Sequence, residues 1–216
     1  MPDTQDFISQ LALNVKPTRL LPSPASLIWV LGAILLIYGV GMSWVLQWRG
    51  DLLAQLQRPF FIAELVVLFV AAIVNLVAAA YLCFPDQYQR SGFTKIALLL
   101  ALAAPVIVLG QLFLPVDVRM ILPVGEEVHK MECALCIAAV SALPSALLVG
   151  VLRRGASVKP NFSAFHSVIA ATCVGCLSLR LAEANDSIPH LLLWHYVPTF
   201  LFAAIGGVLG KKLFAW

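Results

Sequence analysis

The sequence predicts an all-α membrane protein, a bundle of six transmembrane helices. Six apolar stretches of 20 to 25 residues fill most of the 216-residue chain. Each can cross a bilayer, because the hydrocarbon core is about 30 Å thick and a helix rises about 1.5 Å per residue. Charged residues make up only 12% of the chain, about half the share found in soluble domains. The predicted spans are residues 26–48, 60–84, 95–114, 132–152, 163–182 and 188–210.

The chain divides into an N-terminal segment, residues 1–25, and a transmembrane domain, residues 26–216. The connections between spans are too short to hold a further soluble domain. The N-terminal segment carries Asp3 and Asp6 and lacks a long apolar run, so it is not expected to be a signal peptide.

An amphipathic helix is predicted over residues 4–15. Phe7, Ile8 and Leu11 recur there at helical spacing. Such a helix serves either as a membrane-surface anchor or as a docking helix for a cytosolic partner, and the basic residues Lys16 and Arg19 fit both roles. A stiff proline-rich link to the first span follows, with prolines at Pro17, Pro22 and Pro24.

The basic residues predict the orientation. With six spans, both termini lie on one side, and nine of the fourteen lysines and arginines fall on that side. Because basic residues are retained in the cytoplasm, we expect cytoplasmic termini and a place in a bacterial inner membrane. Retention explains these clusters, so no direct nucleic-acid binding is expected. The nine are Lys16, Arg19, Arg90, Lys95, Arg153, Arg154, Lys159, Lys211 and Lys212.

Prolines and glycines mark the later spans. Pro105, Pro144 and Pro198 lie inside the third, fourth and sixth spans, where each removes a backbone donor and is expected to kink its helix. Gly206 and Gly210 form a G-x-x-x-G pair, which permits close helix approach either within the bundle or between two copies.

The cysteines are the most chemically distinctive feature. Two C-x-x-C pairs, Cys133 with Cys136 and Cys173 with Cys176, lie in the outer halves of the fourth and fifth spans. Thiolates suit soft or borderline metals, an oxidising outer compartment permits disulfides, and buried cysteine also packs as a small hydrophobe. We expect Cys133, Cys136 and Cys176 as metal-ligand candidates and Cys83 as a packing residue. Other candidates in outer segments are Glu126, Glu127, His129, Glu132, Glu183 and His190.

Polar residues within the predicted spans are candidates for a role in the bundle, among them Glu64, Asn75 and His195. Glu64 lies about one turn into the second span and is expected to reach the interface. Asn75, near the middle of that span, is expected to bond to a neighbouring helix. His195 follows Trp194 in the sixth span. Polar groups in lipid are costly and are often functional.

Catalytic signatures are absent. The sequence contains no phosphate-binding loop, no H-E-x-x-H and no serine triad motif. A membrane thiol oxidoreductase is the enzymatic alternative, but such enzymes expose cysteines on outer loops, which here hold none. A small transporter is a second alternative, without a clear ion path.

Four segments, taken in order, resemble the NrsF-like family of bacterial integral membrane anti-sigma factors. The likeness extends over nearly the whole chain. The segments are Lys16-Pro17-x-Arg19-x-Leu21, Cys133-x-x-Cys136-Ile137 before Leu152-Arg153-Arg154-Gly155-Ala156, Asp186-Ser187 before Trp194-His195-x-x-Pro198, and Gly206-x-x-x-Gly210-Lys211-Lys212-Leu213-x-x-Trp216.

This resemblance implies a non-enzymatic regulator that holds an extracytoplasmic-function sigma factor at the inner membrane. It implies release on a metal or oxidative signal sensed by outer cysteines, with no required cofactor beyond a transient soft metal. Cys133 matches the first sensing cysteine. The second sensing cysteine of the family lies in a His-Cys pair, and Ala182 and Glu183 stand at those two positions here. Cys176 lies seven residues earlier, on nearly the same helical face, and is the expected substitute.

The expected roles follow from these features. Sensing is assigned to Cys133, Cys136, Cys173 and Cys176. Sigma-factor binding is assigned to the N-terminal helix and to the basic loop between the fourth and fifth spans. These binding residues are Phe7, Ile8, Leu11, Lys16, Arg19, Arg153, Arg154 and Lys159.

Overall fold

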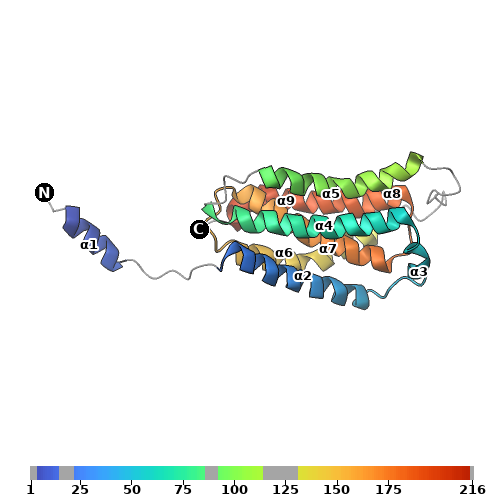
Figure 1. Ribbon diagram of the computed structural model, residues 1–216, viewed down its shortest axis with the longest axis horizontal. Helices are drawn as coiled ribbons and strands as arrows, with labels where there is room; N and C mark the ends of the chain where they lie inside the picture. Colours follow the sequence, from blue (N-terminus) through green and yellow to red (C-terminus); the bar gives the residue numbers. More distant parts are fainter. Residues whose placement is uncertain (1–3, 15–21, 86–91, 114–130, 215–216) are drawn as a thin grey trace.

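The computed structural model describes residues 4–14, 22–85, 92–113 and 131–214, and within these ranges the chain is helical with no strand. Six helices are long and apolar enough to cross a membrane, and they pack side by side as one bundle (Figure 1). The predicted fold class is thus confirmed at this level. The long helices are α2 (Pro24–Val45), α4 (Pro59–Leu82), α5 (Gly92–Gly110), α6 (Met131–Leu152), α7 (Pro160–Ala182) and α9 (Val197–Leu213). The sixth span is continuous from Ile188 to Leu213 and ends in α9.

Short elements complete the chain. Helix α1 (Thr4–Asn14) lies apart from the bundle (Figure 1). The other short elements are α3 (Leu52–Gln55), the 3-10 turn η2 (Gln111–Phe113), α8 (Ile188–His190) and the π-helical segment η4 (Leu191–Tyr196). We call the end of the bundle where α2 begins and α9 stops the terminal end. The opposite end, with α3 and the 183–187 connection, is the distal end.

Proline sets where several helices begin. Pro24, Pro59 and Pro160 each lie in the first turn of a helix, where a missing N–H costs nothing because that donor has no intrahelical acceptor. The first span therefore begins at Pro24, which the sequence had placed in the extended link. Ser23 caps it, its hydroxyl accepting a hydrogen bond from the Ser26 amide at 3.3 Å.

Helix α7 is the centre of the bundle. It packs against α9, α4, α6 and α2, and its mean hydropathy of 1.7 is well below the 2.7 of α4. A helix that touches lipid on few sides can carry small and polar residues, provided that its neighbours satisfy them. One example joins three helices: Asn75 of α4 donates to the Ala97 carbonyl of α5 at 3.1 Å, and its Oδ1 lies 2.7 Å from Nδ1 of His166 on α7. The expected helix-to-helix bond of Asn75 is therefore present.

The two glycines of the G-x-x-x-G pair face α7. A Cβ added at Gly206 would lie 2.6 Å from Val168 Cγ2, and one at Gly210 would lie 2.4 Å from Asn161 Cα. Both distances are shorter than van der Waals contact. The pair is therefore used for close packing within the bundle.

The sixth span is not a regular α-helix. Near its start, the segment η4 is π-helical and leads into Pro198, which lies in the first turn of α9. Proline cannot donate to a carbonyl one turn earlier, and the wider π turn accommodates that gap. Pro105 and Pro144 lie inside α5 and α6, which continue through them.

Replacing Gly210 with alanine is expected to lower the free energy of unfolding by about 1–3 kcal/mol, because the new methyl meets the α7 backbone. Thermal unfolding of the purified protein in detergent measures the loss. Gly150→Ala is the matched control, since nothing lies within 4 Å of its added Cβ. Equal stability of the two variants would contradict the close α7–α9 packing.

Candidate functional site

Three segments converge at the distal end of the bundle. The first turn of α6 supplies Cys133, the connection after α7 supplies Glu183, and the sixth span supplies His190 from α8 and His195 from η4. Glu183 is the C-cap of α7 with extended backbone angles, φ −89° and ψ 135°. Its side chain therefore leaves the line of the helix and turns toward α6.

The four side chains form one compact cluster. One ligand atom from each, the Cys133 sulfur, a Glu183 oxygen and a nitrogen of each histidine, lies within 4.8 Å of all the others. Glu183 is at the centre: the Cys133 thiol lies 3.3 Å from both carboxylate oxygens. The Nε2 atoms of His190 and His195 lie 3.0 Å from Oε1 and Oε2 respectively. We call this group the distal cluster.

Glu183 is the charged centre of this cluster. Burial by itself raises the pKa of its carboxyl, but the contacts with His190 and then His195 outweigh burial and hold the pKa well below its usual range. The group is therefore a carboxylate at neutral pH. The distal cluster thus presents a fixed negative charge in a nearly buried place.

The two histidines differ in their other contacts. Nδ1 of His195 lies 4.0 Å from the Cys176 sulfur, so that Cys176 and Glu183 lie at opposite ring nitrogens. His190 is fully buried, and among the described residues neither of its ring nitrogens has a partner with hydrogen-bond geometry. Burying a polar ring without hydrogen bonds is costly. His190 is therefore the side chain of the cluster that would gain most from a bound ligand.

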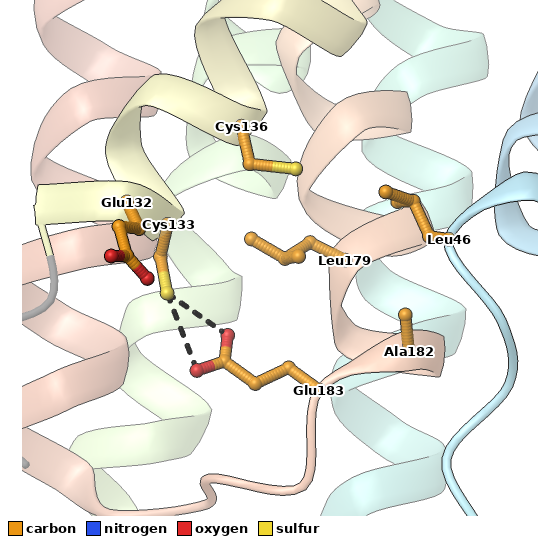
Figure 2. Close-up of a pocket in the computed structure, with 7 residues that line it drawn as sticks. All are labelled: Leu46, Glu132, Cys133, Cys136, Leu179, Ala182 and Glu183. Carbon is orange, nitrogen blue, oxygen red and sulfur yellow. Dashed lines mark hydrogen bonds between the residues drawn. The ribbon is translucent and has the colours of Figure 1, made fainter.

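A pocket at the distal end is lined in part by two members of the distal cluster, Cys133 and Glu183 (Figure 2). It encloses about 480 Å³, including its open mouth. The Cys133 sulfur points toward the Glu183 carboxylate, whereas the Cys136 sulfur points sideways and not toward it (Figure 2). The lining residues are Leu46, Glu132, Cys133, Cys136, Leu179, Ala182 and Glu183.

A second polar group, an ion network, lies beside the cluster. Arg180 of α7 is fully buried and donates two hydrogen bonds of 3.0 Å to Glu64 of α4, one to each carboxylate oxygen. It donates a third, of 2.9 Å, to Asp186 in the 183–187 connection. Tyr196 of η4 also donates to Glu64. The expectation that Glu64 reaches the interface was therefore wrong: its side chain is fully buried and paired.

Arg49 extends the network to the connection after α2. It donates to both oxygens of Asp186, at 2.8 and 2.6 Å, and to both oxygens of Asp51, at 2.6 and 3.0 Å. The hydrogen bonds from Arg49 hold the pKa of Asp51 well below its usual range. Asp186 is three residues from Glu183, so the network fixes the connection that carries the centre of the distal cluster.

The structure separates the predicted sensing cysteines. Only Cys133 belongs to the distal cluster. Cys136 lines the pocket, Cys176 lies behind His195, and Cys173 is buried in the main apolar core. Cys176 and position 183 were expected to share a helical face, but Glu183 lies beyond the end of α7 and is not on that face. Cys83 is buried and contacts the Ala79 carbonyl, as expected of a packing residue.

Those predicted sigma-binding residues that the structure describes lie at or beyond the terminal end. Phe7 and Ile8 of α1 are 58% and 59% exposed. Arg153 and Arg154 are exposed, and Lys159 lies over the Phe162 ring. Lys16, Arg19 and the side chain of Leu11 fall outside the described part of the structure, as do Glu126, Glu127 and His129.

Sequence reasoning missed the ion network. Arg49, Arg180 and Tyr196 entered none of the roles expected from the sequence, and Asp186 entered only as part of a family motif. A signal did exist, because Arg180 lies inside a predicted span, where a charge needs a partner. His190 and Glu183 were noted as outer residues, but nothing in the sequence placed them beside Cys133.

One comparison with known proteins identified a family. The family model described as negative regulator of sigma F matches residues 11–216. No curated protein and no solved structure matches the chain.

Replacing Arg180 with alanine is expected to cost about 3–5 kcal/mol of unfolding free energy, because Glu64 is left as an unpaired buried charge. Thermal unfolding in detergent measures it, and Arg58→Ala, an exposed arginine on the same side of the bundle, is the control. The double change Arg180→Met with Glu64→Leu removes both charges and should lose less stability than Arg180→Ala. A double variant that is no more stable than Arg180→Ala would mean that the unpaired charge of Glu64 is not the main cause of the lost stability.

Proposed function

This chain belongs to the family of negative regulators of sigma F, and on that premise we propose that it is an inner-membrane anti-sigma factor for an extracytoplasmic-function sigma factor. The observation that carries the proposal is the family match, which covers all six spans. A protein that holds a soluble factor at the membrane needs a membrane domain and a docking surface on the cytoplasmic side. We propose no catalytic role.

The docking side is the terminal end, with both chain termini in the cytoplasm. Basic residues gather there, among them Arg153, Arg154, Lys211 and Lys212, whereas Asp51, Glu183 and Asp186 lie at the distal end. The bias of lysine and arginine supports this orientation. The distal cluster then faces the outer compartment.

Helix α1 supplies the main contact with the sigma factor. Its apolar side chains Phe7 and Ile8 are more than half exposed, and the helix stands apart from the bundle (Figure 1). Full burial of one large apolar side chain contributes about 1.5–3 kcal/mol. An amphipathic helix that enters a groove by three such residues therefore holds a partner firmly. Arg153 and Arg154 add a basic surface at the same end.

Release requires a link between the distal and terminal ends. Helices α6 and α7 carry Cys133 and the base of Glu183 at one end, and at the other they are joined by the 153–159 loop. That loop packs tightly: a Cβ on Gly155 would lie 2.5 Å from the Cys83 carbonyl oxygen. A metal or oxidative signal that changes the contact between α6 and the 183–187 connection would shift the two helices and alter the loop. Such a signal can shift the two helices only if it binds one of their two arrangements more tightly than the other.

The docking proposal predicts that Ile8→Asp with Leu11→Asp abolishes sigma-factor binding while the protein remains in the membrane. The two carboxylates would have to enter an apolar groove, which is strongly unfavourable. Co-purification of the sigma factor from detergent extracts measures binding, and membrane fractionation measures retention.

Ser9→Asp with Leu13→Asp is the matched control. It adds the same two charges to α1, but at 100° per residue these positions lie on the opposite side from the Phe7, Ile8 and Leu11 stripe. Binding should persist in this variant. Equal loss in both pairs would point to the charge of α1 rather than to its apolar stripe, and no loss in either would move docking to the basic loop.

The sensing proposal predicts that Cys133→Ser keeps repression of the sigma regulon but loses induction by cadmium or by an oxidant. Cys133 is the only cysteine in the distal cluster, so Cys136→Ser, one turn away, should keep the response. A transcriptional reporter for the sigma regulon measures both variants. Full induction in Cys133→Ser would remove the distal cluster from signal reception and leave only the docking role.

A further inference from the structure

We propose that Cys133, Glu183, His190 and His195 form a binding site for a single zinc-like divalent cation. The proposal deepens the sensing role and rests on it for its biological meaning, but the binding itself is a separate property of the chain. The metal ligands expected from the sequence were Cys133, Cys136 and Cys176. In the proposed site only Cys133 remains from that set, and the other three ligands are a glutamate and two histidines.

The geometry of the distal cluster suits such an ion. Zinc bonds of about 2.0–2.3 Å in a tetrahedron place ligand atoms roughly 3.3–3.8 Å apart. The four atoms here already lie within 4.8 Å of one another, and three of their contacts with Glu183 are 3.0–3.3 Å. Only small side-chain shifts are needed for the four atoms to surround one ion.

The chemistry of the donors selects the class of ion. One thiolate, two imidazoles and one carboxylate are the ligands that Zn²⁺ uses in proteins, and Cd²⁺ favours the sulfur still more. Ca²⁺ and Mg²⁺ take oxygen ligands and are poorly served by three nitrogen or sulfur donors. One thiolate and one carboxylate also match the charge of a dication, so the loaded site is neutral, as a buried site requires.

His190 gives an independent sign that a ligand is missing. Its ring is fully buried and faces Glu183 at 3.0 Å, yet among the described residues neither nitrogen has a partner with hydrogen-bond geometry. A bound cation would satisfy Nε2. His195 is oriented from behind, where Cys176 lies 4.0 Å from Nδ1, in the way that outer contacts commonly orient a ligating histidine.

The position of the distal cluster decides how an ion would reach it and which segments the ion would join. Cys133 and Glu183 also line the pocket at the distal end, through which an ion reaches them (Figure 2). An ion at this place would join α6, the 183–187 connection and the sixth span. The group opposite Cys133 is a carboxylate, which cannot form a disulfide with it, so an ion and not a disulfide would join Cys133 to the 183–187 connection.

Direct binding to the full-length protein in detergent tests the site. Zn²⁺, competed against a chromophoric chelator, should bind one ion per chain. Co²⁺ should give the visible absorption of a tetrahedral site together with a sulfur-to-cobalt charge-transfer band. Cys133→Ser should abolish that charge-transfer band, and Glu183→Gln should weaken Zn²⁺ binding by at least about tenfold, since even outer contacts of a metal site are worth that much.

Two controls separate the site from its surroundings. Cys136→Ser and Glu132→Gln change pocket residues outside the distal cluster and should leave affinity and spectrum unchanged. Zinc should also raise the thermal midpoint of the unaltered protein, because a ligand that binds only the folded state stabilises it. This rise tests the site even if a ligand variant fails to fold.

The outcomes distinguish the site from its proposed use. If the unaltered protein binds no Zn²⁺ or Cd²⁺, or if the cobalt charge-transfer band survives Cys133→Ser, the site is wrong whatever the reporter shows. If the ion binds through these four residues but the sigma regulon does not respond to it, the site stands and the sensing role fails.

Discussion

The buried pair of Arg180 and Glu64 is the constraint on which the distal end of this protein depends. Both side chains are fully buried, and removing two charges from water is costly unless geometry and further hydrogen bonds compensate. Here the guanidinium meets the carboxylate with two bonds and then reaches Asp186, while Tyr196 completes Glu64. Such a pair is weak evidence for net stability, but leaving either charge unpaired is strongly unfavourable, and this restricts how α4, α7 and η4 can be arranged. The specificity of the fold at this end follows from that restriction.

The distal cluster uses the position that the ion network enforces. Asp186 is held by Arg180 and Arg49 at once, so the short connection that also carries Glu183 has little freedom. The π-helical segment then turns His195 toward the same carboxylate. A binding site benefits when supporting contacts hold its ligands before the ion arrives. In this chain the support is electrostatic on one side and comes from an irregular helix on the other.

Helix α7 connects this rigid end to the other. It is covered by four neighbouring helices, and the close contacts at Gly206 and Gly210 fix its distance from α9. A closely packed interior transmits strain, so under the proposed sensing role α7 is the helix that would carry a change at Glu183 to the 153–159 loop. Helix α1 lies outside this framework and carries exposed apolar residues (Figure 1). The protein thus combines a rigid membrane body with a separate segment suited to partner contact.

The sequence by itself determined the six spans, the N-terminal helix and the bond from Asn75 to a neighbouring helix. These depend on local composition: twenty apolar residues make a span whatever surrounds them, and a buried amide always needs a partner. It also indicated Cys133, by a resemblance that followed motif order.

Only the tertiary structure decided the partners of the charged and ligating groups. Glu64 meets Arg180 across 116 residues, and Cys133 meets Glu183 across 50. Hydropathy describes how much of a helix is apolar but not which neighbour covers each face, so Glu64 was expected at the interface and Cys176 beside Cys133. The extended backbone at Glu183 and the π turn before Pro198 arise from the meeting of three segments. Their side-chain directions follow from packing that no periodic pattern encodes.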